Sequence, residues 1–212
     1  MKLEIPLISL PATNPTEWRW LFCQMPEIPI DKFPWGKIAS LPRVAFKIAH
    51  NQENIFLFFH VCEEQVLARY TRHNDPVYTD SCVEFFIAFG DEPDYYNFEF
   101  NSLGTCLAAW GPDRHQRERA NPEKLNLIQT QTIINRVSHY QLPCFEWQLS
   151  IKIPVSSFFK HQISQLSEKT ARANFYKCGD DLDHPHFLCW QTIKTPDPDF
   201  HQPFYFGEIG FL

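Results

Sequence analysis

Hydrophobic and polar residues alternate along much of the chain, and this pattern predicts β-strands. In residues 145–153 every odd position is apolar and every even position is polar, so the segment has one core face and one solvent face. Residues 44–49 and 95–101 show the same two-residue period. Residues 55–61 and 82–89 are almost entirely apolar, which is typical of strands in the centre of a sheet.

Further strand-like segments follow, with turn-forming residues between them: 106–110, 125–137, 171–178, 186–193 and 206–212. Residues 154–166 have the composition of a short helix, with a serine available as its N-cap. The strand–helix alternation of nucleotide-binding α/β folds is missing from this pattern. Eight to ten short strands predict an all-β fold, an antiparallel β-sandwich of the jelly-roll kind with two sheets and one or two short helices.

The length of 212 residues suits one domain, which we expect to span residues 1–212. Residues 1–42 contain seven of the 17 prolines. They should form an irregular, extended arm packed on the body, with one short strand near its start. The aromatic group WRWLFC at residues 18–23 is expected to anchor this arm.

Charge and cysteine content narrow the class of protein. The net charge of -6, without a Lys/Arg cluster, argues against a nucleic-acid partner, because phosphate backbones require a basic surface. No apolar run reaches membrane-spanning length, so no membrane contact is expected.

The same sequence suggests a compartment. No secretory leader is visible at the N-terminus, and seven cysteines are an odd number. We therefore expect free thiols in a cytoplasmic protein, with Cys62, Cys82, Cys106 and Cys189 buried as small hydrophobic residues. The alternative is a secreted protein whose leader is not part of this sequence.

The strand at residues 95–101 carries an unusual polar face. Asn97, Glu99 and Asn101 follow Tyr95 at two-residue spacing. Amides and carboxylates pair with sugar hydroxyls, and aromatic rings stack on the C–H faces of sugars. The row therefore indicates a surface for a polyhydroxyl ligand. A polar strand edge that faces solvent is the structural alternative.

Glu84 interrupts the apolar strand at residues 82–89. Burying an unpaired carboxylate is strongly unfavourable. The side chain is therefore expected either to face a ligand cleft or to form an ion pair with Arg69 or Arg72, which lie in the preceding loop. We favour the ligand contact.

Five motifs, taken in order, resemble the family 9 carbohydrate-binding modules, and in particular a stand-alone bacterial branch with a DOMON-like sandwich. The motifs are DPVYTDSCVEFFIAF at 75–89, YYNFEFNSLGTCL at 95–107, FEWQLSIKIP at 145–154, ARANFYKC at 171–178 and the tail at 187–211. The resemblance covers the chain from about Val44 to its end. It implies a β-sandwich that binds sugars without cleaving them.

The resemblance also implies a set of sugar-binding residues. In the family, two tryptophans sandwich a terminal sugar and polar groups hold its hydroxyls. The predicted site is Tyr78, Glu84, Asn97, Glu99, Asn174, Tyr176, Phe200 and His201. Tyr78 and either Phe200 or His201 match the tryptophans, and Asn97 stands where the family has Arg. Because of these departures, neither the affinity nor the particular sugar transfers.

Each aromatic position has a structural alternative. Tyr78 precedes a strand, where a rim position and packing back onto the core are both reasonable. Phe200 and His201 lie in a segment stiffened by prolines at 196, 198 and 203, and they either present a ring to a ligand or close the end of the sandwich. Tyr176 joins the predicted set because it shares a strand face with Asn174.

No cofactor or metal site is predicted. Calcium binding is left open, because the family's calcium ligands cannot be matched to positions in this chain. The segment CGDDLDHPH at residues 178–186 has oxygen, nitrogen and sulfur ligands, but their spacing fits no usual site, and a solvated acidic turn is favoured. The basic residues at 114–119 suggest an anionic ligand, and a solvated loop is favoured there too.

Three functions follow from these observations. The first is non-catalytic carbohydrate binding through ring stacking and hydroxyl contacts, in carbohydrate metabolism. The second is glycoside hydrolysis with Glu84 and Glu99 as the two carboxyls, because glycosidases place a carboxyl pair across the sugar. The third is a sandwich that binds a protein partner. We favour the first, with no catalytic residue.

Overall fold

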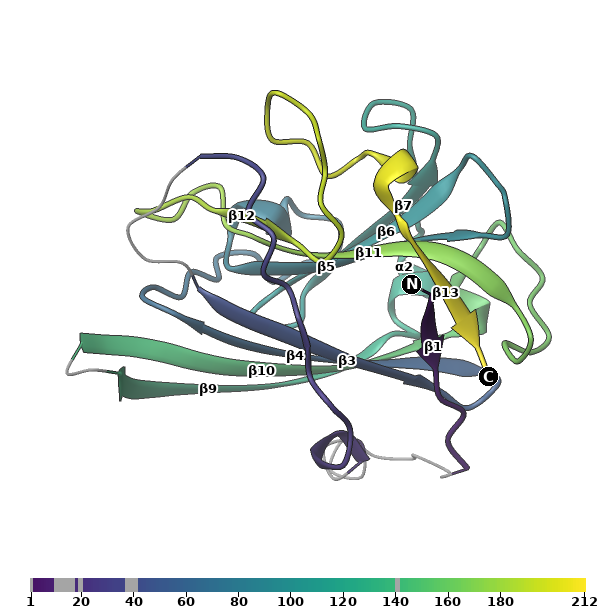
Figure 1. The fold of residues 1–212 in the computed structure, drawn as a ribbon, viewed down its shortest axis with the longest axis horizontal. Helices are drawn as coiled ribbons and strands as arrows, with labels where there is room; N and C mark the ends of the chain where they lie inside the picture. The colour runs from purple at the N-terminus through teal and green to yellow at the C-terminus, as the bar shows by residue number, and fades with distance from the viewer. Residues whose placement is uncertain (1, 10–17, 19–20, 37–41, 140–141) are drawn as a thin grey trace.

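The structure, a computed structural model, describes residues 2–9, 18, 21–36, 42–139 and 142–212. Two β-sheets lie face to face, as upper and lower layers in Figure 1. The upper sheet has the strand order β1-β13-β11-β5-β6-β7-β8, and β12 pairs with β11. Its strands are β1 (Leu3–Ile5), β5 (Cys82–Phe89), β6 (Tyr95–Asn101), β7 (Cys106–Gly111), β8 (Glu118–Arg119), β11 (Thr170–Cys178), β12 (Phe187–Cys189) and β13 (Gly207–Phe211).

The lower sheet has the order β2-β3-β4-β10-β9. Its strands are β2 (Ile28–Pro29), β3 (Arg43–His50), β4 (Asn54–Glu63), β9 (Gln129–His139) and β10 (Leu142–Pro154). Every named strand pair in the two sheets is antiparallel except β1 with β13. The predicted all-β sandwich is therefore confirmed.

Helical structure is short and only partly where it was expected. The helix predicted at 154–166 is wrong, because only a 3-10 turn forms there, η2 (Val155–Ser157), without a side-chain cap. Phe158 and Leu166 are fully buried, and these two anchors hold the segment in an irregular path across the sandwich. The other helical segments are η1 (Val77–Thr79), α2 (Pro122–Leu125) and η3 (Pro203–Tyr205).

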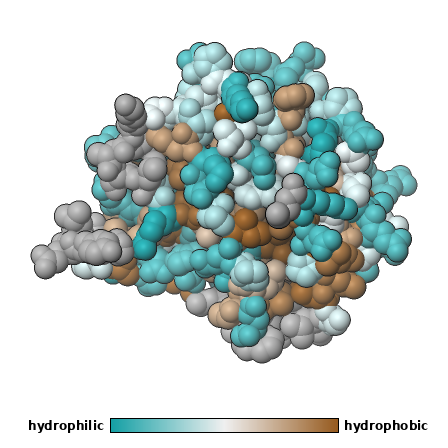
Figure 2. Space-filling view, viewed as in Figure 1, coloured by the Kyte–Doolittle hydropathy of each residue, from teal (hydrophilic) through white to brown (hydrophobic). Residues whose placement is uncertain are grey.

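The main core lies between the two sheets and is rich in phenylalanine. Phe46 of β3 stacks on Phe175 of β11 with ring centroids 3.7 Å apart, which joins the layers directly. Trp147 is fully buried in the same core, as the alternation in residues 145–153 predicts. In Figure 2 hydrophobic residues gather across the middle and lower part of the molecule, whereas the loops at the top are mostly hydrophilic.

The described part of the N-terminal arm crosses both layers. β1 pairs with β13 at one edge and β2 pairs with β3. Of the predicted anchor, Trp18 and Phe22 are buried and pack against Phe56 and Phe58 on the outer face of the lower sheet. Positions 19–20 of the anchor lie outside the described residues.

A buried charged cluster also links the sheets. The ammonium of Lys177 lies 2.9 Å from a carboxylate oxygen of Glu63 and 2.9 Å from Nε2 of His186. The indole nitrogen of Trp147 donates to the other Glu63 oxygen at 2.7 Å. Burial by itself would raise the pKa of Glu63, but the charge of Lys177 and the contact with His186 hold it below its ordinary value.

All seven cysteines are free thiols. Cys82, Cys106 and Cys189 are buried, as expected, whereas Cys62 is only partly buried and lies 3.4 Å from the sulfur of Cys144. Among the described residues, no helix has both the length and the apolar character needed to cross a membrane.

Candidate functional site

The outer face of the upper sheet provides the floor of the candidate site. Residues alternate along β5, so Val83, Phe85 and Ile87 enter the main core while Cys82 and Glu84 point the other way. Glu84 is directly opposite Glu99 on β6 and Tyr176 on β11. The strand pairing therefore brings side chains from three strands together on this face.

Loops above this floor enclose a cavity of about 360 Å³, which is within the usual range for small-molecule sites, about 300–1,000 Å³. The wall residues come from η1, from the loop after β7, and from the segments around β12 and before η3. Six of the eight predicted residues line the cavity: Tyr78, Glu84, Asn97, Glu99, Phe200 and His201.

Glu99 and Asn97 form the polar centre of the cavity with Arg117. The Asn97 amide nitrogen donates to Oε1 of Glu99 at 2.7 Å. Arg117 donates to the Asn97 amide oxygen from Nε at 2.9 Å and from Nη2 at 2.6 Å. The second Glu99 oxygen, Oε2, is buried and has no hydrogen-bond partner among the described residues. Such an orphaned acceptor is costly unless a ligand or water satisfies it.

Arg117 is fixed by backbone as well as by Asn97. It donates to the carbonyl oxygens of Tyr95, Ala109, Gly111 and Asp113, and its guanidinium lies 4.4 Å from the centroid of the Tyr95 ring. A side chain with this many partners has little freedom, so Arg117 serves to hold Asn97 and Glu99 in place.

The two carboxyls are both difficult to ionise. Burial, the Cys178 thiol and the charge of Glu99 raise the pKa of Glu84 well above its ordinary value. Burial raises the pKa of Glu99 to about 7, against the opposing effects of the Asn97 hydrogen bond and Arg117. Neither Arg69 nor Arg72 pairs with Glu84, because Arg69 contacts Asp80 and Asp181 and Arg72 contacts Asp75. Glu84 instead accepts from the Cys178 thiol at 3.1 Å.

The aromatic residues occupy different depths. Tyr78 is 37% exposed at the rim. Phe200 is buried and stacks on Tyr176 with ring centroids 4.1 Å apart. His201 Nδ1 lies 2.8 Å from the Tyr95 hydroxyl, and burial together with the charge of Arg117 lowers the pKa of His201 to about 3. His201 is therefore neutral at ordinary pH.

Asn174 and Tyr176 do not line the cavity, although they lie on the floor strand β11. Asn174 is fully buried, and its amide bonds the backbone of Gln191 in both directions. Tyr176 is also fully buried and donates to the carbonyl of Phe200 at 3.1 Å. Asn174 and Tyr176 project from a part of the sheet face that is covered by loops. Both side chains therefore support the loops around the cavity.

Asp80 fixes the loop that carries Tyr78. This fully buried carboxylate accepts from the backbone N–H groups of Arg69 and Tyr70 and from the Asn101 side chain. Asn101 therefore has a structural partner on the same strand face where the sequence suggested a ligand contact. The arrangement ties β6 to the rim of the cavity.

The sequence interpretation missed much of the charged wall. Cavity-lining residues outside the predicted set include Arg114, His115, Arg117, Arg119, Asp180 and Asp199. Four of them belong to the basic segment that was interpreted as a solvated loop. The signal that was available is Gly111, since a Cβ at this position would overlap the carbonyl oxygen of Gln116. Only glycine allows the backbone of Gln116 to come this close.

The acidic segment at 178–186 divides between several environments. Asp180 lines the cavity, and burial raises its pKa to about 6. Asp181 pairs with Arg69 at the surface, and His186 belongs to the buried cluster with Lys177. The segment therefore does not act as a single group of ligands.

A β-sandwich with a cavity of rings, amides and carboxyls on one sheet face defines a binding domain for a small polar ligand. The model of "Carbohydrate-binding family 9" matches residues 21–211. The chain belongs to this family, and the resemblance drawn from its motifs is confirmed.

Solved structures agree with this assignment. The chain is 32% identical to a candidate carbohydrate-binding protein from Bacteroides uniformis ATCC 8492, with a TM-score of 0.89 over 100% of this chain and 99% of that one. It shares its fold with a family 9 module from Caldicellulosiruptor kristjanssonii. The glucose complex gives 12% sequence identity and a TM-score of 0.57, and the match covers 100% of this chain and 96% of that one. The cellotriose complex gives 11% sequence identity and a TM-score of 0.60, and the match covers 100% of this chain and 93% of that one. The search of curated proteins gave no match.

Proposed function

We propose that the chain binds a mono- or oligosaccharide in the cavity above β5, β6 and β11, and that this binding serves carbohydrate metabolism. The observation that carries the proposal is the buried Oε2 of Glu99 in the floor of the cavity, which has no hydrogen-bond partner among the described residues. Family membership and the family 9 structures in complex with glucose and cellotriose support the same class of ligand.

In this proposal Glu99 accepts a sugar hydroxyl through Oε2, and Asn97 uses its remaining amide hydrogen as a donor. Arg114 is an exposed cavity residue that forms no hydrogen bond or ion pair with the part of the chain that the structure describes, so its guanidinium is available to ring or hydroxyl oxygens. Tyr78 supplies an accessible ring face at the rim, on which the C–H surface of a sugar stacks. Phe200 and His201 close the opposite wall.

The roles proposed for Asn174 and Tyr176 are indirect. Tyr176 holds Phe200 by stacking and by a hydrogen bond, and Asn174 holds Gln191. Substitution of either residue is expected to alter the position of the wall. Neither side chain reaches the ligand in this proposal.

The facing carboxyls support a second candidate function, glycoside hydrolysis. Directly opposite residues of antiparallel strands have Cβ atoms about 4.5–5.5 Å apart, and retaining glycosidases hold two carboxyls about 5–5.5 Å apart. Glu84, with its strongly raised pKa, fits a general acid. Glu99, whose pKa burial raises to about 7, fits a nucleophile once it has ionised. Family membership favours binding over hydrolysis.

Calorimetric titration at pH 8 with glucose, cellotriose and a broader glycan panel tests the proposal. Glu99→Gln keeps the shape of the side chain but removes the charged acceptor, and should weaken binding about 10- to 100-fold, since a hydrogen bond to a charged group contributes about 1.5–3 kcal/mol. Glu123→Gln, on the exposed surface of α2, should bind as the parent does.

Tyr78→Ala tests stacking against Phe204→Ala, which removes a ring that is 87% exposed and does not line the cavity. Only Tyr78→Ala should lose affinity. Turnover of chromogenic glycosides that disappears in Glu99→Gln would establish the hydrolase instead. A lack of binding across the whole panel would contradict both functions and favour a protein partner.

A further inference from the structure

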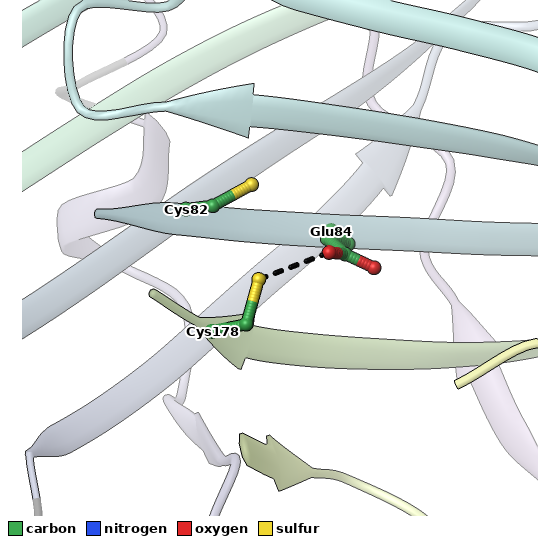
Figure 3. A group of neighbouring side chains, drawn as sticks. All are labelled: Cys82, Glu84 and Cys178. Atoms are coloured by element: carbon green, nitrogen blue, oxygen red, sulfur yellow. Dashed lines mark hydrogen bonds between the residues drawn. The ribbon is translucent and has the colours of Figure 1, made fainter. Parts of the chain in front are cut away.

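Two thiols and a carboxyl converge at the floor of the cavity. Cys82 and Glu84 project from the same face of β5, and Cys178 on β11 is the register partner of Cys82. Figure 3 shows the three side chains on the two strands, with the Cys178 sulfur directed toward a Glu84 oxygen. The two sulfur atoms and a carboxylate oxygen all lie within 4.8 Å of one another. No other group of this kind occurs among the residues that the structure describes.

The separations suit a common metal ion. Zinc bonds to thiolate sulfur at about 2.3 Å and to carboxylate oxygen at about 2.0–2.2 Å, so tetrahedral ligands of one ion lie about 3.4–3.8 Å apart. The sulfur of Cys178 and Oε1 of Glu84 are 3.1 Å apart. Shifts of about 1 Å, which rotation of two cysteine side chains supplies, therefore bring all three ligands to bonding distance.

The surroundings of Glu84 leave it available for a cation. It is 3% exposed and forms no salt bridge in the described structure. The only basic side chain on the neighbouring part of β11, Lys177, points into the main core, where its ammonium pairs with Glu63. A divalent ion at the three ligands would therefore meet no competing positive charge from that strand.

The three ligands differ in their access to the cavity. Glu84 and Cys178 line it, whereas Cys82 is fully buried behind them. An ion held by all three would thus have protein on one side and the cavity on the other. Three protein ligands with a fourth position open to water or ligand is the arrangement found in zinc sites that act on bound molecules.

We propose that Cys82, Glu84 and Cys178 bind a thiophilic divalent cation of the Zn²⁺ class, with its fourth position open to the cavity. As the ion binds, the two thiols and the carboxyl release their protons to solvent and form two metal–sulfur bonds and one metal–oxygen bond. The proposal is independent of carbohydrate binding, because it depends only on this cluster. If a sugar also enters, its hydroxyl is a candidate for the fourth position.

The test uses the full chain carrying Cys23→Ser and Cys144→Ser. These changes remove an exposed thiol and one member of the Cys62–Cys144 pair, which are the other sites at which thiols are accessible or adjacent. After chelator treatment, Zn²⁺ is titrated in competition with a chromophoric chelator, and Co²⁺ is followed by its thiolate charge-transfer and visible bands.

We expect one equivalent of Zn²⁺ and a tetrahedral cobalt spectrum with sulfur ligation. Cys82→Ala, Cys178→Ala and Glu84→Gln should each weaken Zn²⁺ binding at least 10-fold, the scale on which changes at metal sites act. Cys189→Ala, which removes another fully buried thiol from the same sheet, should leave it unchanged.

X-ray absorption of the zinc-loaded parent gives a result that does not depend on how the variants fold. Two sulfur ligands and oxygen ligands in the remaining positions would support the site. Less than stoichiometric uptake, a zinc shell without sulfur, or uptake that persists unchanged in Cys82→Ala and Cys178→Ala would overturn the proposal.

Discussion

Glu99→Gln should change how the stability of the protein depends on pH. Glu99 is 5% exposed, and its pKa in the folded protein is about 7, compared with an ordinary value of 4.5. The folded state therefore holds a proton that the unfolded state has already released between these two values. A carboxyl of this kind contributes its stability at low pH, and the contribution is lost as the pH rises through 7.

The size of the effect follows from the two pKa values. A difference of about 2.5 between 7 and 4.5 corresponds to about 3 kcal/mol in the free energy of unfolding. The side chain introduced by Glu99→Gln cannot ionise, so this variant should lose about 2.5 kcal/mol less stability than the parent between pH 5 and pH 8. Glu84 faces Glu99, and loss of the Glu99 charge also eases the ionisation of Glu84, which flattens the profile of the variant in the same direction.

Urea unfolding followed by intrinsic fluorescence at pH 5, 6, 7 and 8 measures this difference. Near pH 5 the free energies of unfolding of the parent and Glu99→Gln should differ least, because Glu99 is still neutral in the folded protein there. Glu123→Gln controls for loss of an exposed carboxyl and should parallel the parent throughout. Parallel profiles for the parent and Glu99→Gln would refute the assignment of a raised pKa to Glu99, and with it the account of a desolvated floor.

Three further substitutions test other parts of the structure. Lys177→Met leaves the buried Glu63 without its ammonium partner and should lower the free energy of unfolding by about 3–5 kcal/mol; a loss below about 1 kcal/mol in urea unfolding would contradict a structural role for this ion pair. Arg117→Lys loses the two contacts to Asn97 and should weaken sugar binding about 10-fold in calorimetry, because Lys lacks the planar fork; unchanged affinity would exclude a positioning role. Asp80→Asn weakens the hydrogen bonds that hold the rim and should reduce stability by about 1.5–3 kcal/mol; protease cleavage after Arg69 or Arg72 at the parent rate would show that the loop does not depend on Asp80.

Local alternation was enough to predict the strands of the floor. Residues 82–89 and 95–101 form β5 and β6 with the predicted bounds and the predicted faces, because side chains alternate strictly along a strand and one face must enter the core. The helix expected at 154–166 failed for a tertiary reason. Burial of Phe158 and Leu166 prevailed over helix propensity.

The candidate site was predictable only in part. Glu84, Asn97 and Glu99 stand out because polar residues on apolar strands need a partner. Arg117 could not be identified in the same way, since apart from Asn97 its acceptors are backbone carbonyls of β6 and β7 and of the turn that follows. Asn174 and Tyr176 share the floor strand with Cys178, but loops that pack over them separate them from the cavity. How such loops pack above a sheet depends on the whole fold, so the local sequence does not predict it.

The division between a hydrogen-bonded floor and a wall made of separate loops has a consequence for engineering. The wall segments around Tyr78, after β7 and before η3 enter the cavity from distant parts of the chain. Each is therefore a separate place where a library of replacement sequences could be grafted while β5, β6 and β11 stay constant, provided that Arg117, which holds Asn97 of the floor, is kept. New ligand specificities could then be sought by exchanging loop segments while the strands of the sheet stay the same.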